Sequence, residues 1–289
     1  MSKNKKADKK KSNWSDIWKR LKRNRMAMLG LVLIIILILS AALAPIIAPY
    51  GFDDQDVSRA FLGPSLSHLF GTDNLGRDVF SRILYGGRIS LTMGLISVSL
   101  ASVVGIFLGA VAGYYGGKID DVIMRILDVL MAMPNILLAI AIAAALGPGL
   151  VNCMVAVGIS TIPRFARVVR GPILAIRNQE YIEAATAVNA SDGRIIFRHV
   201  LPNVLAPIIV QSTLYIANAV MAASSLSFLG MGVQPPSPEW GAMLSAGRQY
   251  IREYWHIVTF PGIAIMLTVF SLNVLGDGLR DALDPRLKN

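Results

Sequence analysis

The feature that most restricts the fold of this chain is a set of five long stretches without Asp, Glu, Lys or Arg, at residues 26–48, 89–117, 129–163, 203–238 and 254–276. A helix needs about 20 mainly apolar residues to cross the hydrocarbon core of a membrane. Each stretch is long enough for one crossing, and the third is long enough for two. Because a backbone surrounded by lipid must satisfy its own hydrogen bonds, the sequence predicts an all-α polytopic membrane protein.

A turn signal divides these stretches into six expected transmembrane helices. Gly147-Pro148-Gly149 splits the third stretch, because glycine and proline favour a turn over a continuing helix. An overall composition of 54% hydrophobic and 16% charged residues excludes an ordinary soluble domain. The six spans are expected at about residues 26–48, 89–114, 121–146, 150–168, 204–229 and 256–278.

The first 25 residues form a basic tail. It holds eleven Lys or Arg and two Asp, so it carries +9 of the net charge of +10. Directly before a membrane span, such a tail is typical of a cytoplasmic segment that favours anionic lipid headgroups, with a nucleic-acid-binding arm as the alternative. Trp14, Ile17, Trp18 and Leu21 recur at helical spacing, which predicts a short amphipathic helix on the inner membrane surface. The apolar stretch that follows exceeds the roughly 7–15 residues of a signal-peptide core, so an uncleaved first span is expected.

Basic residues also mark the end of the fourth expected span. Arg164, Arg167 and Arg170 are spaced by three, share a helix face and are followed by Arg177. Lys and Arg are enriched in cytoplasmic loops, so this end is expected inside. Six spans then place both termini in the cytoplasm.

Residues 177–203 form the longest charged and polar island in the second half of the chain. Residues 180–188 favour a helix, Asn189 is suited to the left-handed conformation that ends one, and Ser191 or Asp192 is suited to cap a second. Pro202 is expected to stop that second helix. By spacing alone this helical hairpin is compatible with an ordinary structured loop. A DNA-reading helix-turn-helix is disfavoured, because the neighbouring segments are membrane-like.

Residues 50–88, between the first two expected spans, are polar and contain five Asp and four Arg. Within them, residues 71–78 read GTDNLGRD. Gly, Asn and Asp favour turns, so a turn-rich loop is expected in which Asp and Arg pair locally. Its charges nearly cancel, which is compatible with a segment on the outer side of the membrane.

Several motifs resemble permease subunits of bacterial ATP-binding-cassette (ABC) importers. Glu183-Ala184-Ala185, followed by Ile196 and Leu201-Pro202, is similar to the coupling loop of these permeases, whose short helix sits in a groove of the ATPase subunit; Asn189 stands where the family usually has glycine. GTDNLGRDVFSRILYGGRISL resembles more specifically the C-type subunit of dipeptide, oligopeptide and nickel importers. SFLGMGVQPPSPEWG and LNVLGDGLRDALDPR extend the resemblance to nearly all of the chain after residue 20.

The resemblance implies an ABC importer type I permease fold with three parts. These are a basic cytoplasmic tail (1–25), a first helix with an extracytoplasmic segment (26–88), and a five-helix core (89–289) that carries the coupling loop (177–203). Contact with the ATPase is implied for Glu183, Ala184, Ala185, Asn189, Ile196, Leu201 and Pro202. The outer signature consists of Gly71, Thr72, Asp73, Gly76, Arg77 and Asp78, for which contact with substrate or binding protein is one expectation.

The implied partners are a paralogous B-type permease subunit, two cytoplasmic ABC ATPase subunits and an extracytoplasmic solute-binding protein. The implied location is the bacterial cytoplasmic membrane, with lipid and no nucleic acid among the ligands. The implied cargo is a di- or oligopeptide, with a nickel chelate, an antimicrobial peptide or another small solute as alternatives.

The sequence contains no GxxxxGK[ST] phosphate loop and no catalytic Ser/His/Asp or Cys/His set, and its single cysteine lies in an apolar stretch. It therefore predicts a transport subunit rather than an enzyme, without a metal or cofactor of its own; ATP and Mg²⁺ are expected on the ATPase subunits. A self-sufficient secondary transporter is a rival, but it would usually place ionisable groups at mid-membrane, where the uncharged stretches have none.

Overall fold

The structure is a computed structural model that describes residues 13–283; the first 12 residues of the predicted basic tail and the last six residues of the chain lie outside this range. Within it, the regular secondary structure is helical, and backbone pairing of the β type is confined to an isolated bridge between Thr72 and Asp78. The prediction of an all-α protein is therefore confirmed for the described part of the chain.

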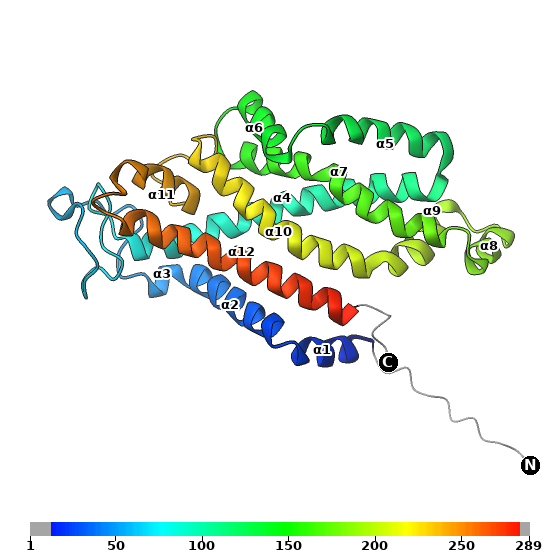
Figure 1. Ribbon diagram of the computed structural model, residues 1–289, viewed down its shortest axis with the longest axis horizontal. Helices are drawn as coiled ribbons and strands as arrows, with labels where there is room; N and C mark the ends of the chain where they lie inside the picture. The colour runs from blue at the N-terminus through cyan, green and yellow to red at the C-terminus, as the bar shows by residue number, and fades with distance from the viewer. Residues whose placement is uncertain (1–12, 284–289) are drawn as a thin grey trace, which may run out of the picture.

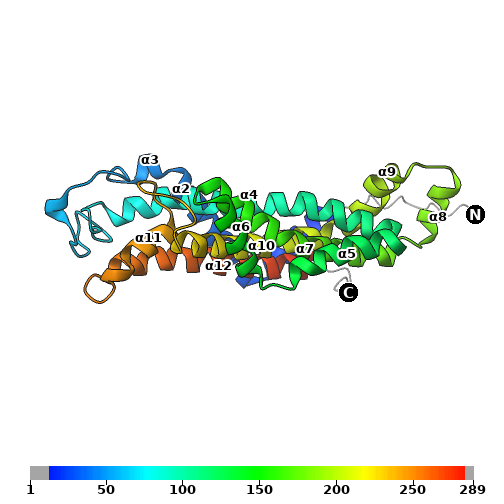
Figure 2. The same cartoon turned by 90° about the horizontal axis from the view of Figure 1, so that it is seen from above.

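Long helices run roughly along the long axis of the molecule (Figure 1). The loop between α3 and α4 lies at one end, and the small helices α8 and α9 lie at the other, in both views (Figures 1 and 2). The polar segments predicted from the sequence are thus at opposite ends of the helices. The long helices are α2 (Arg25–Ala42), α4 (Val79–Tyr115), α7 (Leu150–Ile176), α10 (Leu205–Phe228) and α12 (His256–Leu283).

Shorter helices complete the described part. They are α1 (Asn13–Arg23), α3 (Ala44–Ile47), η1 (Val57–Arg59), α5 (Gly117–Met131), α6 (Asn135–Leu146), α8 (Glu180–Ala187), α9 (Asp192–Ile195), η2 (Ile196–Val200), η3 (Leu201–Val204), α11 (Trp240–Gly247) and η4 (Arg248–Tyr250). The amphipathic helix expected before the first span is α1. Its Ile17 and Leu21 pack against Leu279 and Ala282 of α12, so this apolar side also covers the end of another helix.

Within residues 13–283, four helical segments are long and apolar enough to cross a membrane: α2, α4, residues 192–228 and α12. The pair α5 and α6 makes a fifth if it counts as one bent span. The remaining expected span, the fourth, at about residues 150–168, corresponds to α7, which lies beside α4 but carries Arg164, Arg167 and Arg170 in its second half.

Two expected spans differ from the observed helices. The second was expected from residue 89, whereas α4 begins at Val79 because the Asp78 side chain caps it by accepting the Ser81 N–H. The third was expected at about residues 121–146 as one span. Instead α5 begins at Gly117, and an 85° bend separates it from α6. Pro134 precedes α6 and has no N–H to continue the hydrogen-bond ladder.

Glycines allow two pairs of helices to pack closely. Gly105, Gly109 and Gly113 line one face of α4 and lie directly against α7, where a Cβ atom on Gly109 would stand 2.4 Å from the Ala166 carbonyl oxygen. On α2, a Cβ atom on Gly30 would lie 2.6 Å from the Ser271 carbonyl oxygen of α12. The α4 glycines therefore serve helix packing inside the subunit.

Gly109→Ala is expected to destabilise the subunit. The added methyl group would meet backbone, which cannot move aside as a side-chain end can, and such overpacking costs about 1–3 kcal/mol. Gly171→Ala in α7 is the control, because a Cβ atom there meets nothing within 4 Å while the gain in helix propensity is the same. Thermal unfolding of the detergent-solubilised subunit measures both. An unchanged melting temperature for Gly109→Ala would contradict this account of the packing.

Candidate functional site

The hairpin at residues 177–203 begins with α8, which ends in a Schellman motif. The Ala190 N–H donates to the Ala185 carbonyl at 3.1 Å, and the Asn189 N–H donates to the Thr186 carbonyl at 2.9 Å. Asn189 has a φ of 57°, the left-handed conformation expected for it. The next helix, α9, begins after Ser191, whose side chain makes no capping hydrogen bond.

Asn189→Gly is expected to leave transport intact, since glycine adopts a positive φ without strain. Asn189→Val is the contrasting variant: a left-handed backbone costs a residue with a Cβ about 1–2 kcal/mol, and a β-branched side chain makes it worse. The measurement is uptake by cells that contain equal amounts of each variant. Loss of uptake in Asn189→Gly would show that the asparagine side chain, and not the turn, is what matters.

The second half of the hairpin does not end at Pro202, contrary to expectation. After α9 the chain forms the π-helical turn η2 and the 3₁₀ turn η3, and then continues directly into α10. Pro202 lies in the first turn of η3, where a missing N–H breaks no hydrogen bond within the turn. The backbone therefore stays helical from α9 into α10.

Buried isoleucines and valines anchor the hairpin to the long helices. Ile182, Ile195 and Ile196 belong to one apolar cluster that also contains residues of α4 and α7 such as Ala110 and Ile173. Ile195 and Ile173 are 0% exposed. The hairpin therefore rests on α4 and α7 through a packed core, and its orientation depends on theirs.

The anchoring divides the expected contact residues into two groups. Ile196 is buried, and Ala185 and Leu201 are half-buried, so these three residues support the hairpin from inside. The exposed members are Glu183, Ala184, Asn189 and Pro202.

Two large apolar side chains lie uncovered on the hairpin. Val188 is 78% exposed and Phe197 is 73% exposed. Next to α8, a shallow hollow of about 380 Å³ is lined by Arg177, Ile182, Glu183, Thr186 and Ala187. The hairpin thus combines a rigid interior with an exposed face that carries charge and apolar surface, as a docking element requires.

Polar contacts join the hairpin to the end of α4. The Tyr114 hydroxyl donates to Asp192 Oδ1 and the Tyr115 hydroxyl donates to Asp192 Oδ2, each at 3.0 Å. Arg177 Nη1 donates to the Gly113 carbonyl at 3.4 Å. The sequence suggested Asp192 only as a helix cap; its tyrosine partners are 77 and 78 positions away, too far for spacing rules to reveal.

Two ion pairs join α5 to α7. Arg170 Nε and Nη2 each lie 2.5 Å from a carboxylate oxygen of Asp120, and Arg167 pairs with Asp128. The partners of these aspartates are two of the arginines that mark the expected cytoplasmic end of α7. The two-point contact between Arg170 and Asp120 fixes the relative orientation of the two side chains in addition to pairing their charges.

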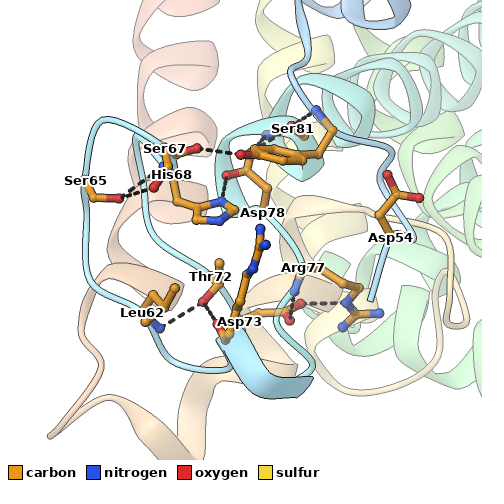
Figure 3. Close-up of polar contacts among 12 residues, drawn as sticks. Asp54, Leu62, Ser65, Ser67, His68, Thr72, Asp73, Arg77, Asp78 and Ser81 are labelled. Atoms are coloured by element: carbon orange, nitrogen blue, oxygen red, sulfur yellow. Dashed lines mark hydrogen bonds and ion pairs between the residues drawn. The ribbon is translucent and has the colours of Figure 1, made fainter. Parts of the chain in front are cut away.

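The outer signature is a closed hydrogen-bond network (Figure 3). Asp73 Oδ1 accepts the backbone N–H groups of Leu75 and Arg77 at 2.9 and 3.0 Å, and Asp73 Oδ2 accepts Arg77 Nε at 2.7 Å. Arg82 Nε stands 3.7 Å from the same oxygen. Asp73, Arg77 and Arg82 are all buried. These residues hold the segment together, and contact with substrate or binding protein stays a prediction.

Asp78 and Thr72 extend this network to other elements. Asp78 Oδ2 accepts the Ser81 N–H and hydroxyl, each at 2.7 Å, and Asp78 Oδ1 lies 3.0 Å from His68 Nδ1. The Thr72 hydroxyl accepts the Leu62 N–H at 2.8 Å, and the Thr72 carbonyl lies 3.2 Å from His256 Nε2. The segment is thereby tied to α4 and to α12.

Tight turns complete the outer signature. Gly71 and Gly76 have φ angles of 76° and 72°. At Gly76 a Cβ atom would stand 1.8 Å from the Asp56 carbonyl oxygen, so only glycine fits. Asp56 itself accepts hydrogen bonds from the hydroxyl and N–H of Ser58, and this bonding lowers the pKa of its carboxyl group.

A buried glutamate, which the sequence did not single out, joins three helices. Glu239 is 0% exposed. Its Oε1 accepts the Ser90 hydroxyl of α4 at 3.0 Å and the Ser224 hydroxyl of α10 at 3.3 Å, and its Oε2 caps α11 by accepting the Ala242 N–H at 2.8 Å. The carboxylate therefore connects the glycine- and proline-rich loop after α10 to the N-terminal part of α4.

Known proteins similar to this chain share its architecture and most of its length. Residues 105–289 match the family model described as the binding-protein-dependent transport system inner membrane component, and residues 12–64 match the N-terminal transmembrane domain of oligopeptide transport permease C. Structures of the MetNI methionine ABC transporter in inward-facing conformations match at TM-scores of 0.55 and 0.57 with 20% identity; the first covers 69% of this chain and 94% of that one. This likeness confirms the expected type I permease fold.

Two relatives are similar over nearly the whole chain. The dipeptide transport system permease protein DppC of Alkalihalophilus pseudofirmus is 49% identical over 96% of this chain and 91% of its own length. The glutathione transport system permease protein GsiD of Escherichia coli is 49% identical over 98% of this chain and 94% of its own length. Together with the family model, which covers more than half of the chain, these similarities identify the protein as a member of the binding-protein-dependent transport system inner membrane component family and, within it, as a C-type permease subunit of a peptide ABC importer.

Proposed function

We propose that this subunit carries di- or oligopeptides inward across the bacterial cytoplasmic membrane, paired with a paralogous B-type subunit. The observation that carries the proposal is the 49% identity, over 96% of this chain, to a permease named for dipeptide transport. The relative named for glutathione transport favours a small peptide-like cargo over a nickel chelate, which is the alternative within the same family.

Energy would come from two cytoplasmic ATPase subunits that hold the ATP and Mg²⁺, and this subunit would bind neither. Their contact would be the hairpin, with Glu183, Ala184 and Asn189 facing the ATPase. The exposed face and the packed interior of the hairpin support this assignment. Closure of an ATPase dimer would push the hairpin, which would tilt the helices on which it rests.

The membrane topology that fits this role has six crossings, with α7 as one and the bent pair α5 and α6 as another. Both termini would lie in the cytoplasm, on the same side as the hairpin. Basic residues support this orientation: Arg20, Lys22 and Arg23 end α1, and arginines line the second half of α7. Residues 1–25, 26–88 and 89–289 would then be the tail, the outer part with its first helix, and the core.

The test is transport by a reconstituted complex. The subunit is co-produced with its B-type partner, the ATPases and the binding protein, and labelled dipeptide uptake into proteoliposomes is measured with and without ATP. ATP-dependent uptake of dipeptide but not of nickel chelate is expected. Ion-gradient-driven uptake by this subunit alone would overturn the proposal in favour of a secondary transporter.

A further inference from the structure

The contact between Asp192 and the two tyrosines is a joint between the hairpin and a helix to which the hairpin is not directly connected in sequence. Both carboxylate oxygens of Asp192 are used, one by each tyrosine, at 3.0 Å. We propose that Tyr114, Tyr115 and Asp192 are positioning residues through which movement of the hairpin is passed to α4. This inference rests on the proposed coupling role of the hairpin.

Both halves of the hairpin reach the same end of α4. Asp192 lies in the second half, after the Asn189 turn, and binds the two tyrosines. Arg177 lies at the start of the hairpin; it donates to the Gly113 carbonyl, and its Nη1 fills the space in which a Cβ atom on Gly116 would stand, 2.0 Å away. A rotation of the hairpin therefore acts on α4 at two separate points. Forces at two points rotate α4 as well as displace it.

The structure of α4 suits it to carry that movement further than α7 does. α4 has 37 residues and no proline, so at about 1.5 Å per residue it is a continuous helix of roughly 55 Å. α7, which leads directly into the hairpin, contains Pro163 and Pro172, each of which removes a hydrogen bond and permits bending.

The opposite end of α4 belongs to the outer network. Asp78 caps its first turn, and the Ser90 hydroxyl, three turns further on, binds Glu239 before α11. A displacement that enters at Tyr114 and Tyr115 therefore arrives at the outer segment and at the loop after α10. α4 thus joins the proposed ATPase contact to the outer end of the transport path.

The experiment measures coupling rather than activity alone. Asp192→Asn and the double variant Tyr114→Phe/Tyr115→Phe remove the charge or the hydroxyls and keep the shapes. In the reconstituted complex, uptake per ATP hydrolysed is expected to fall about fivefold or more, the scale of a typical coupling free energy between sites. Co-purification of the ATPase subunits is expected to be unchanged. Tyr115→Phe alone leaves the hydrogen bond from Tyr114, so its uptake per ATP hydrolysed is expected to lie between those of the unaltered subunit and the double variant.

Combining the changes tests whether the three residues act as one unit. Because Asp192→Asn and the tyrosine changes remove the same interaction, the triple variant should lose no more coupling than the double variant. Tyr250→Phe is the control, since it removes a hydroxyl at the outer end of the molecule, where the ring packs against Phe61. It should leave uptake per ATP unchanged.

The results separate this inference from the function on which it rests. If the unaltered subunit neither retains the ATPases nor supports uptake, the proposed function fails. If the unaltered complex transports and the variants keep its uptake-to-ATP ratio, the function stands and the joint is refuted. If the variants, Tyr115→Phe included, lose the ATPase subunits or unfold, the contact is structural and the joint is likewise refuted.

Discussion

Glu183→Lys is expected to lower uptake about 100-fold while the subunit still inserts into the membrane. Glu183 is exposed, lies in the first turn of α8 and lines the hollow beside that helix together with Arg177. Reversing its charge would place Lys next to Arg177 and at the positive end of the helix dipole. Loss of a contact at the centre of a protein interface commonly costs 2 kcal/mol or more, and each 1.4 kcal/mol is about tenfold in affinity.

The matched control is Glu180→Lys, on the same turn of α8. It reverses the same charge at the same helix end, but Glu180 does not line the hollow. We expect a much smaller loss of uptake. The amount of each variant in the membrane fraction is measured in parallel. Unchanged uptake in Glu183→Lys would reject the hairpin as the ATPase contact.

Asp73→Ala is expected to destabilise the outer segment by about 3–5 kcal/mol, the usual cost of removing one partner from a buried ion pair. The change would leave the Arg77 and Arg82 guanidinium groups buried without their shared carboxylate. It would also leave the backbone N–H groups of Leu75 and Arg77 without an acceptor. The expected result is a lower melting temperature in detergent, with faster proteolysis between α3 and α4.

Asp54→Ala is the control for this prediction. Asp54 is an exposed carboxylate in the same segment that accepts only the Gly51 N–H, at 2.8 Å. Its loss should change stability by less than about 0.5 kcal/mol, as for most surface substitutions. Equal melting temperatures for Asp73→Ala and Asp54→Ala would mean that the buried network contributes little to the fold.

Local rules predicted much of this structure from sequence. The absence of charge located most of the long helices, and the turn at Asn189 has the expected backbone conformation. These features depend on a few adjacent residues. The same rules failed at Pro202. A proline ends a helix when its missing N–H interrupts the helical hydrogen bonds, but Pro202 lies in the first turn of η3, where no such bond is needed.

Contacts between distant residues were beyond such rules. The bond between Ser90 and Glu239 joins positions 149 apart, and those from Asp192 to its tyrosines join positions 77 and 78 apart. The GTDNLGRD motif was identified correctly as a pattern, but nothing in its letters distinguishes a surface that binds a partner from a buried network. The burial of these side chains depends on how the whole chain packs, which the motif alone does not show.

The glycine contacts between helices have a consequence for how the subunit changes shape. α4 packs against α7, and α2 packs against α12, so closely that the two helices of a pair cannot slide along each other. α10 contacts α4, α7 and α12, and its Ser212, Thr213 and Asn218 side chains donate to carbonyl groups one turn earlier in α10 itself. These side chains therefore do not tie α10 to a neighbour. We therefore expect the two helices of each pair to move together when the subunit changes shape.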